Sequence, residues 1–232
     1  MTVDVEDYFH VAAFEDTINP VNWPSYTTRV EKNTDALLQL FDRKNLTATF
    51  FVLGWVAERY PELVQTIYDS GHEIASHGYS HQIVYKQKQE TFKEEAIRSK
   101  KILEDIIQVP VTGYRAASYS ITPKSLWALD ILADAGYEWD SSIFPIHHDR
   151  YGIPNSPTSP YYIRTTSGAI IKELPLTTAK YMGFKLPAAG GGYFRLFPYW
   201  LSRSLLKKAS KQSPAIFYLH PWEIDPDQPR VE

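Results

Sequence analysis

Residues 34–53, TDALLQLFDRKNLTATFFVL, contain the two elements that decide the fold. The apolar residues Leu37, Leu38, Leu40 and Phe41 recur at helical spacing, which predicts a helix over 34–44. The run 47–53 is rich in β-branched and aromatic residues and has no internal Gly or Pro, which is typical of a buried strand. A helix followed by a buried strand is the repeating unit of a parallel sheet covered by helices.

The same alternation continues on both sides of this stretch. Further strands are expected at 2–5, 72–76, 111–114 and 137–140. Further helices are expected at 62–69, at 91–107 and from Thr122-Pro123 to Ala135. The pattern predicts the α/β class with a largely parallel sheet, and a length of 232 residues fits a single α/β barrel.

The alternation breaks between Phe144 and Tyr199. This stretch contains seven prolines and the run Gly190, Gly191, Gly192, and it is too long for a simple barrel connection. Short strands are expected near 162–164 and 169–174, after which a helix at 200–209 and a strand at 215–219 resume the pattern. The chain is therefore predicted to be one domain over 1–232 with an insertion at about 144–199.

Composition excludes several classes of protein. Hydrophobic residues at 44% and charged residues at 22% are near the averages of globular domains, so the chain has material for a core. The net charge of −3 and the lack of any block of like charges argue against a nucleic-acid partner. There is no cysteine, so any metal ion must be held by nitrogen and oxygen ligands. No apolar run approaches the length of a membrane span, and the chain is expected to be soluble and cytoplasmic.

Polar side chains follow four of the expected strands where each strand ends. In α/β barrels the loops at the carboxyl ends of the strands build the active site, so these side chains are expected to meet. They are Asp4, Glu6 and Asp7; His77 and His81; Arg115 and Ser118; and His220.

His77 and His81 are four residues apart, so on a helical turn both imidazoles face the same side and can share a metal ion. An acid from the first strand end would complete a His, His, carboxylate set, which suits zinc and other divalent ions. The alternative without a functional role is a histidine-rich loop that binds no metal.

Asp4, Arg115 and His220 each have a structural and a chemical interpretation. Asp4 can cap a turn or act as a general base beside a cation. Arg115 can be an ordinary surface arginine or can pair with a carboxylate and hold it ionised. His220 can be a core histidine, or it can be the acid that protonates an amine leaving group.

In combination these residues resemble a known family. The ordered segments TVDVED (2–7), SHGYSH (76–81), YRAAS (114–118), Asp140 and Leu219-His220 are similar to the five motifs of the polysaccharide deacetylases of carbohydrate esterase family four, the NodB-homology domain. The segments DVEDYFH (4–10), GGGYFR (190–195) and HPWE (220–223) resemble the deacetylases encoded with bacterial exopolysaccharide and exosortase loci. The resemblance spans nearly the whole chain and implies a distorted (β/α) barrel.

The resemblance also implies a role for each matching residue. His77 and His81 match metal ligands, Asp4 the catalytic base and Arg115 the arginine that positions it. The Ser118 N–H matches the oxyanion donor, His220 the catalytic acid and Asp140 the aspartate that tunes this acid. Two departures stand out: Val5 follows Asp4 where a second aspartate is usual, so the metal carboxylate is Glu6 or Asp7, and Ala117 replaces the usual proline.

The function expected from this resemblance is metal-dependent removal of N-acetyl groups from hexosamine units of a polysaccharide or its lipid-linked precursor, with zinc as the ion and an N-acetylated glycan as the partner. Substrate contacts are expected from Tyr119, Tyr193, Arg195 and Trp222, because aromatic faces stack on sugar rings and a guanidinium offers several donors. A hydrolase of small cyclic amides such as allantoin is the alternative enzyme. A sugar-binding module without activity is the alternative from another class.

Overall fold

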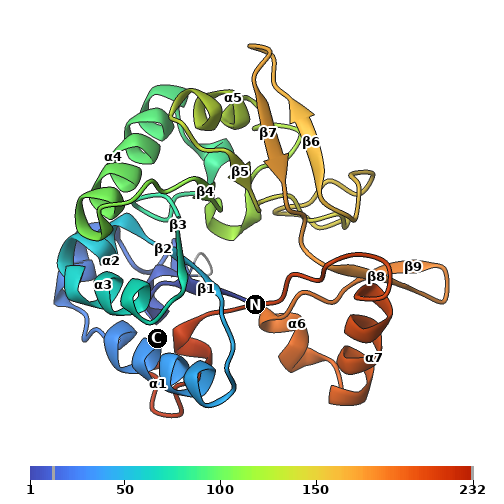
Figure 1. Cartoon of the computed structure of the whole chain (residues 1–232), viewed down its shortest axis with the longest axis horizontal. Helices are drawn as coiled ribbons and strands as arrows, with labels where there is room; N and C mark the ends of the chain where they lie inside the picture. Colours follow the sequence, from blue (N-terminus) through green and yellow to red (C-terminus); the bar gives the residue numbers. More distant parts are fainter. Residues whose placement is uncertain (12–13, 231–232) are drawn as a thin grey trace.

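A curled sheet of eight strands forms the centre of the molecule (Figure 1). The computed structural model describes residues 1–11 and 14–230. The strand order is β10-β1-β2-β3-β4-β5-β7-β6, and neighbouring strands are parallel except for the antiparallel pair β6 and β7. The strands are β1 Thr2–Val5, β2 Thr49–Val52, β3 Glu73–Ser76, β4 Gly113–Tyr114, β5 Trp139–Asp140, β6 Tyr161–Arg164, β7 Ile170–Glu173 and β10 Tyr218–Leu219.

Five helices cover the outer side of this sheet, and in Figure 1 they extend from the lower left of the molecule, where α1 lies, to its top, where α5 lies. They are α1 Val30–Arg43, α2 Gly54–Arg59, α3 Pro61–Asp69, α4 Gln89–Ile107 and α5 Trp127–Asp134. Their apolar faces pack on the sheet: Phe41 of α1, for example, lies edge-on to Phe50 of β2, and both are buried. Burying one such side chain contributes roughly 1.5–3 kcal/mol to folding.

A lobe lies beside the sheet, at the lower right of Figure 1. It consists of the hairpin β8 Thr178–Tyr181 and β9 Phe184–Pro187, followed by α6 Gly191–Leu196 and α7 Tyr199–Ala209. Ala179, Ala188, Leu205 and Ala209 form its small core between the hairpin and α7.

The predicted α/β fold with a distorted barrel is confirmed, because the parallel-rich sheet curls into a half-barrel with helices outside. Each of the five strands expected before residue 141 contains the observed strand. The helix expected from Thr122 begins five residues later, at Trp127. Its expected cap is used in a turn instead, in which the Lys124 N–H donates to the Thr122 hydroxyl and the Ser125 N–H to the Thr122 carbonyl.

The stretch predicted as an insertion contributes to the main sheet as well as to the lobe. β7 lies parallel to β5, and β6 pairs with β7 as a hairpin. The hairpin β8–β9 and the helix α6 are absent from the sequence-based expectations. For α6 the reason is that three glycines at 190–192 argue against a helix. Gly190 and Gly191 have positive φ, and a side chain at either would collide with Tyr218, so their role in the structure is close packing on β10.

Among residues 1–11 and 14–230, no helix combines the length and the apolar character that crossing a membrane requires.

Candidate active site

The parallel strands bring the expected polar residues together at one edge of the sheet. Asp4 and Glu6 come from the end of β1, His77 follows β3, Arg115 follows β4 and His220 follows β10. A cavity of about 300 Å³ opens at this edge. Eight of the predicted site residues line it: Asp4, Glu6, His77, His81, Ser118, Tyr119, His220 and Trp222.

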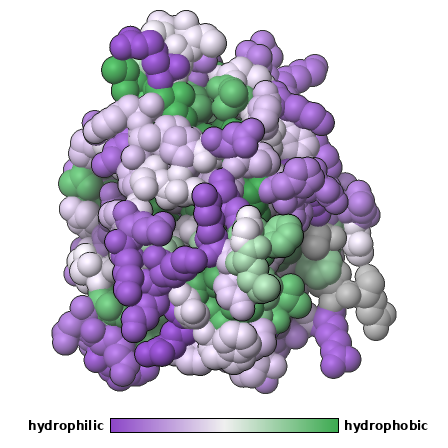
Figure 2. Space-filling model, turned by 90° about the vertical axis from the view of Figure 1, so that its right-hand side faces the viewer, coloured by the Kyte–Doolittle hydropathy of each residue, from purple (hydrophilic) through white to green (hydrophobic). Residues whose placement is uncertain are grey.

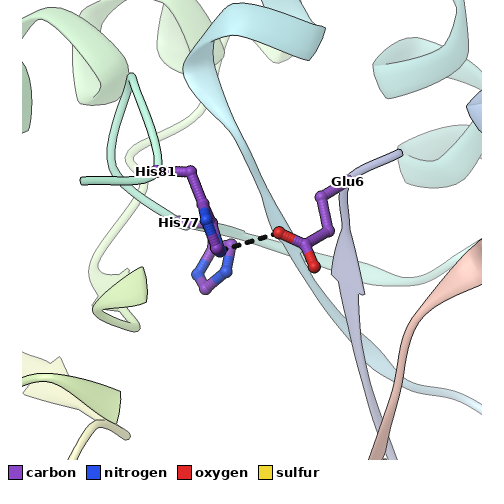
Figure 3. Close-up of side chains that lie close together, drawn as sticks. All are labelled: Glu6, His77 and His81. Carbon is purple, nitrogen blue, oxygen red and sulfur yellow. Dashed lines mark ion pairs between the residues drawn. The ribbon is translucent and has the colours of Figure 1, made fainter. Parts of the chain in front are cut away.

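Glu6, His77 and His81 form a possible metal site (Figure 3). One potential ligand atom from each lies within 4.8 Å of the other two. His81 Nε2 is 2.7 Å from Glu6 Oε2, and the imidazoles of His77 and His81 face the same space from the loop after β3. Two imidazoles and one carboxylate are the ligand set of many hydrolytic zinc sites.

The structure distinguishes between the two acids left open by the sequence. Asp7 caps a 3₁₀ turn, and its carboxylate accepts the N–H groups of Tyr8, Arg29 and Val30. These bonds direct it away from the histidines. Glu6 is the acid that lies against the histidines. Its Oε1 accepts a hydrogen bond of 3.2 Å from the indole Nε1 of Trp222.

The protonation of these groups fits a divalent cation. His77 Nδ1 lies 2.8 Å from the Arg115 carbonyl, which can only accept, so Nδ1 carries the proton and Nε2 keeps a free lone pair. Burial lowers the pKa of His77 to about 4, so the ring is neutral at neutral pH. Burial raises the pKa of Glu6, but the adjacent His81 and the other histidines lower it overall. His81 Nδ1 is buried without a hydrogen-bond partner among the described residues.

Asp4 lies beside this cluster in a buried ion pair. Arg115 Nη1 donates to Asp4 Oδ1 at 2.6 Å, and the Tyr119 hydroxyl donates to Asp4 Oδ2 at 3.2 Å. The guanidinium is itself fixed by Ser141 and by the face of Phe51. Burial raises the pKa of Asp4, but the charge of Arg115 and the neighbouring histidines lower it overall, so the carboxylate is ionised and able to accept a proton.

Ser118 lies in a strained turn that lines the cavity. Ser118 and Tyr119 have φ values of 51° and 54°, a left-handed conformation that is costly for residues with a side chain. The turn is held by the Ala116 N–H, which donates to the Ser142 hydroxyl at 2.7 Å, and by the Tyr119 hydroxyl on Asp4. The Ser118 N–H donates to no acceptor among the described residues, which leaves it free for a substrate oxygen.

His220 faces both acids of the first strand. Its Nε2 is 3.5 Å from Glu6 Oε1 and 3.8 Å from Asp4 Oδ2, and its ring stacks on Trp222. On its other side, Nδ1 is 3.4 Å from Glu223 Oε2, and the same oxygen accepts the backbone N–H of His220. Burial lowers the pKa of His220, but the interaction with Glu223 and the charges of Glu6 and Asp4 raise it to about 9.

Asp140, which is predicted to tune His220, forms no ion pair with this histidine among the described residues. The described carboxylates within 4.0 Å of the His220 ring nitrogens are those of Asp4, Glu6 and Glu223. Asp140 instead accepts a hydrogen bond from the Ser142 hydroxyl. The same hydroxyl accepts a hydrogen bond from the Ala116 N–H, at the start of the strained turn. It also lies beside Glu173 on β7, and burial raises the pKa of both acids. Asp140 therefore supports the Ser118 turn, and Glu223 is the carboxylate on the far side of His220.

The four expected substrate contacts lie at different depths. Tyr119 and Trp222 line the cavity. Tyr193 stands behind the wall, with its hydroxyl 2.9 Å from that of Tyr151. Arg195 does not line the cavity: it pairs with Glu223 at 3.1 Å and lies 5.5 Å from the Trp222 ring, with 53% of its side chain exposed.

Sequence reasoning missed a group of residues on the cavity wall. The segment after β5 contributes His148, Arg150 and Tyr151, and β10 contributes Tyr218. The irregular loop that contains His148, Arg150 and Tyr151 has no periodic pattern that could have indicated a shared wall. Glu223 could have been found, because it lies three residues after His220 in the segment HPWE.

Comparisons with known proteins agree with this site. The family model described as polysaccharide deacetylase matches residues 14–139, more than half of the chain, and a domain of unknown function, DUF3473, matches residues 141–232. A peptidoglycan deacetylase of Helicobacter pylori is 32% identical over 130 residues, covering 55% of this chain and 39% of that protein. Chitin deacetylase 1 of Cryptococcus neoformans is 32% identical over 91 residues, covering 39% of this chain and 19% of that protein. The chain thus spans well under two thirds of these relatives.

Solved structures share the fold. A putative polysaccharide deacetylase from Mycobacterium smegmatis superposes with a TM-score of 0.68 at 22% identity, covering 96% of this chain and 76% of that one. Puue allantoinase superposes with a TM-score of 0.62 at 15% identity, covering 95% of this chain and 76% of that one. At such identities the likeness concerns the fold alone. The match of this family model over more than half of the chain shows that the chain belongs to the polysaccharide deacetylase family.

Proposed function

We propose that this protein is a metal-dependent N-deacetylase that removes acetyl groups from N-acetylhexosamine units of a polysaccharide or lipid-linked saccharide in exopolysaccharide biosynthesis. One observation carries the proposal. An ionised carboxylate, a His, His, carboxylate cluster and a histidine able to donate a proton line a single cavity. The named deacetylases among the relatives support this activity, and the segments GGGYFR and HPWE support the exopolysaccharide setting.

The protein groups would divide the reaction between them. Asp4 takes a proton from the attacking water as the water oxygen bonds to the acetamide carbon. The Ser118 N–H stabilises the carbonyl oxygen as it becomes negative. His220 then donates its proton to the nitrogen as the C–N bond breaks, which yields acetate and a free amino sugar. Asp4 and His220 Nε2 both border the cavity and are close enough to act on one tetrahedral centre.

Glu6, His77 and His81 would hold the divalent ion, and zinc suits two imidazoles and a carboxylate. When bound, such an ion polarises the acetamide carbonyl and acidifies the attacking water. The hydrogen bond from His77 Nδ1 to the Arg115 carbonyl orients that imidazole for its ligand role.

Acetate release from a panel of substrates tests the proposal. The panel contains N-acetylglucosamine oligomers, peptidoglycan fragments, an N-acetylated exopolysaccharide and allantoin, each with and without added Zn²⁺. Acetate from a glycan supports the proposal. Turnover of allantoin alone would assign the protein to the cyclic amide hydrolases, and glycan binding with no turnover in any metal would make it a binding module.

We predict that Glu223→Gln moves the alkaline limb of the kcat/KM profile to lower pH, by about one unit or more. Glu223 stabilises the protonated form of His220, so its loss lowers the pKa of the acid, and the active protonated form is lost earlier as pH rises. The pH profile on a small acetylated substrate measures this. Arg195→Ala is the matched control, since it removes the other partner of Glu223 but keeps the carboxylate. A limb that stays in place in Glu223→Gln, or moves down equally in the control, would contradict the assignment.

Arg195 gives a second prediction. Its half-exposed guanidinium lies at the rim beside Trp222, beyond the cavity that holds the reacting groups. Arg195→Ala should therefore lower kcat/KM for a long glycan several-fold more than for a single acetylated sugar, because only the longer substrate reaches it. Equal loss on both substrates, together with a lower melting temperature, would show that Arg195 acts only through its ion pair with Glu223.

A further inference from the structure

The charges of this chain are unevenly distributed. From residue 174 to residue 222 there is no aspartate or glutamate, although the chain as a whole has a net charge of −3. The same stretch has seven basic residues, which are Lys180, Lys185, Arg195, Arg203, Lys207, Lys208 and Lys211. All seven belong to residues 175–213, here called the basic lobe, which contains β8, β9, α6 and α7.

Most of these basic groups lack an acidic partner. Among the described residues, Arg195 is the one member of the set that pairs with a carboxylate. Lys185 and Lys208 donate to backbone carbonyls. Arg203 and Lys207 are exposed one turn apart on α7, an arrangement of like charges that weakens a helix. Apart from Arg195, the basic side chains of the lobe thus form a positive surface with no carboxylate partner among the described residues.

Apolar side chains protrude from the same lobe at two places. Met182 and Phe184, at the turn of the β8–β9 hairpin, are 82% and 73% exposed. Leu196 and Trp200, where α6 meets α7, are 74% and 66% exposed. Figure 2 shows the side of the molecule on which the lobe lies, with hydrophobic residues showing between hydrophilic ones. Aromatic rings alone would suit sugar stacking, but exposed Met and Leu side chains gain from burial in an acyl environment.

We propose that the basic lobe docks on the surface of a bilayer that contains anionic lipids. The basic side chains that lack a carboxylate partner complement the negative headgroups, and the protruding apolar side chains enter the boundary between headgroups and acyl chains. The lobe adjoins the cavity, since Arg195 contacts Glu223 and Gly190 pairs with Tyr218. Docking would therefore hold the active site beside the membrane, where a lipid-linked saccharide is presented; this last step rests on the proposed function, and the docking itself does not.

Vesicle co-sedimentation of the full chain tests the docking. The vesicles are phosphatidylcholine alone and a mixture of phosphatidylcholine with phosphatidylglycerol, each at low and high salt. We expect binding to the mixed vesicles only, and weakening by salt. Arg203→Glu combined with Lys207→Glu should lower the partition coefficient at least about tenfold. Met182→Ser combined with Phe184→Ser should remove the part of the binding that survives high salt.

Lys93→Glu combined with Lys101→Glu is the matched control, because both lysines are exposed on α4, away from the lobe. Acetate release from a small soluble substrate and the melting temperature show that each variant is folded. Vesicle binding needs no substrate, so failure of the docking and failure of the proposed function are separate results. Absence of binding to the mixed vesicles would overturn the proposal. So would equal loss in the control, capture of an acidic polysaccharide in place of vesicles, or a lobe-dependent dimer that binds no vesicle.

Discussion

Asp4→Asn should retain the divalent ion and lose deacetylase activity by about a hundredfold or more. The carboxylate is the proposed base, and an amide of the same shape cannot accept the proton of the attacking water. The ion should remain because its three candidate ligands, Glu6, His77 and His81, are unchanged. Acetate release measures the first effect, and metal content after gel filtration measures the second.

This substitution also affects stability, which must be separated from catalysis. Arg115 is fully buried and makes its ion pair with Asp4, so an asparagine leaves the guanidinium without a compensating charge. Loss of one partner of a buried pair typically costs about 3–5 kcal/mol, although the asparagine oxygen still accepts a hydrogen bond. The melting temperature should therefore fall, and activity must be compared well below it.

Tyr119→Phe is the matched control for Asp4→Asn. It removes the hydroxyl that donates to Asp4 Oδ2 but leaves the carboxylate and Arg115 in place. A much smaller loss of activity is expected, since the base itself survives. If Asp4→Asn lost the ion, Asp4 would be a ligand. If it kept most of its activity, the base would be another group.

The architecture could be predicted from the sequence because each element carries its own signal. The helix over 34–44 and the strand over 47–53 are set by local periodicity, and a parallel sheet follows from their alternation. Strand ends meet at one edge in such a sheet, which is why Asp4, His77 and His220 could be expected to lie together. The observed cavity contains all three.

The parts that could not be predicted depend on where neighbouring loops go. Glu6 and Asp7 differ by one position, and the choice between them depends on the N–H groups of Arg29 and Val30, which arrive from a distant segment to occupy Asp7. Asp140 lies at a strand end, as expected, but Ser142 and Glu173 engage it beneath the Ser118 turn. Both outcomes are set by tertiary contacts that no local pattern records.

His77→Ala combined with His81→Ala should abolish metal binding together with activity. Two of the three ligand groups are lost, and the remaining carboxylate cannot hold a divalent ion alone in competition with water. Metal stoichiometry by elemental analysis should fall from about one ion per chain to none. Activity should fall by several orders of magnitude, since polarisation of the carbonyl and acidification of water both depend on the ion.

Thermal unfolding gives a readout of the same site that does not involve activity. Ligand that binds only the folded state raises the melting temperature, so added Zn²⁺ should stabilise the metal-free wild type and leave the double variant unchanged. His148→Ala is the matched control, because His148 lines the same cavity outside the Glu6, His77, His81 cluster. It should keep both the stoichiometry and the Zn²⁺-dependent stabilisation. An ion retained by the double variant, or lost by His148→Ala alone, would place the metal elsewhere in the cavity. Either result would also remove the basis for assigning Asp4 rather than Glu6 as the base.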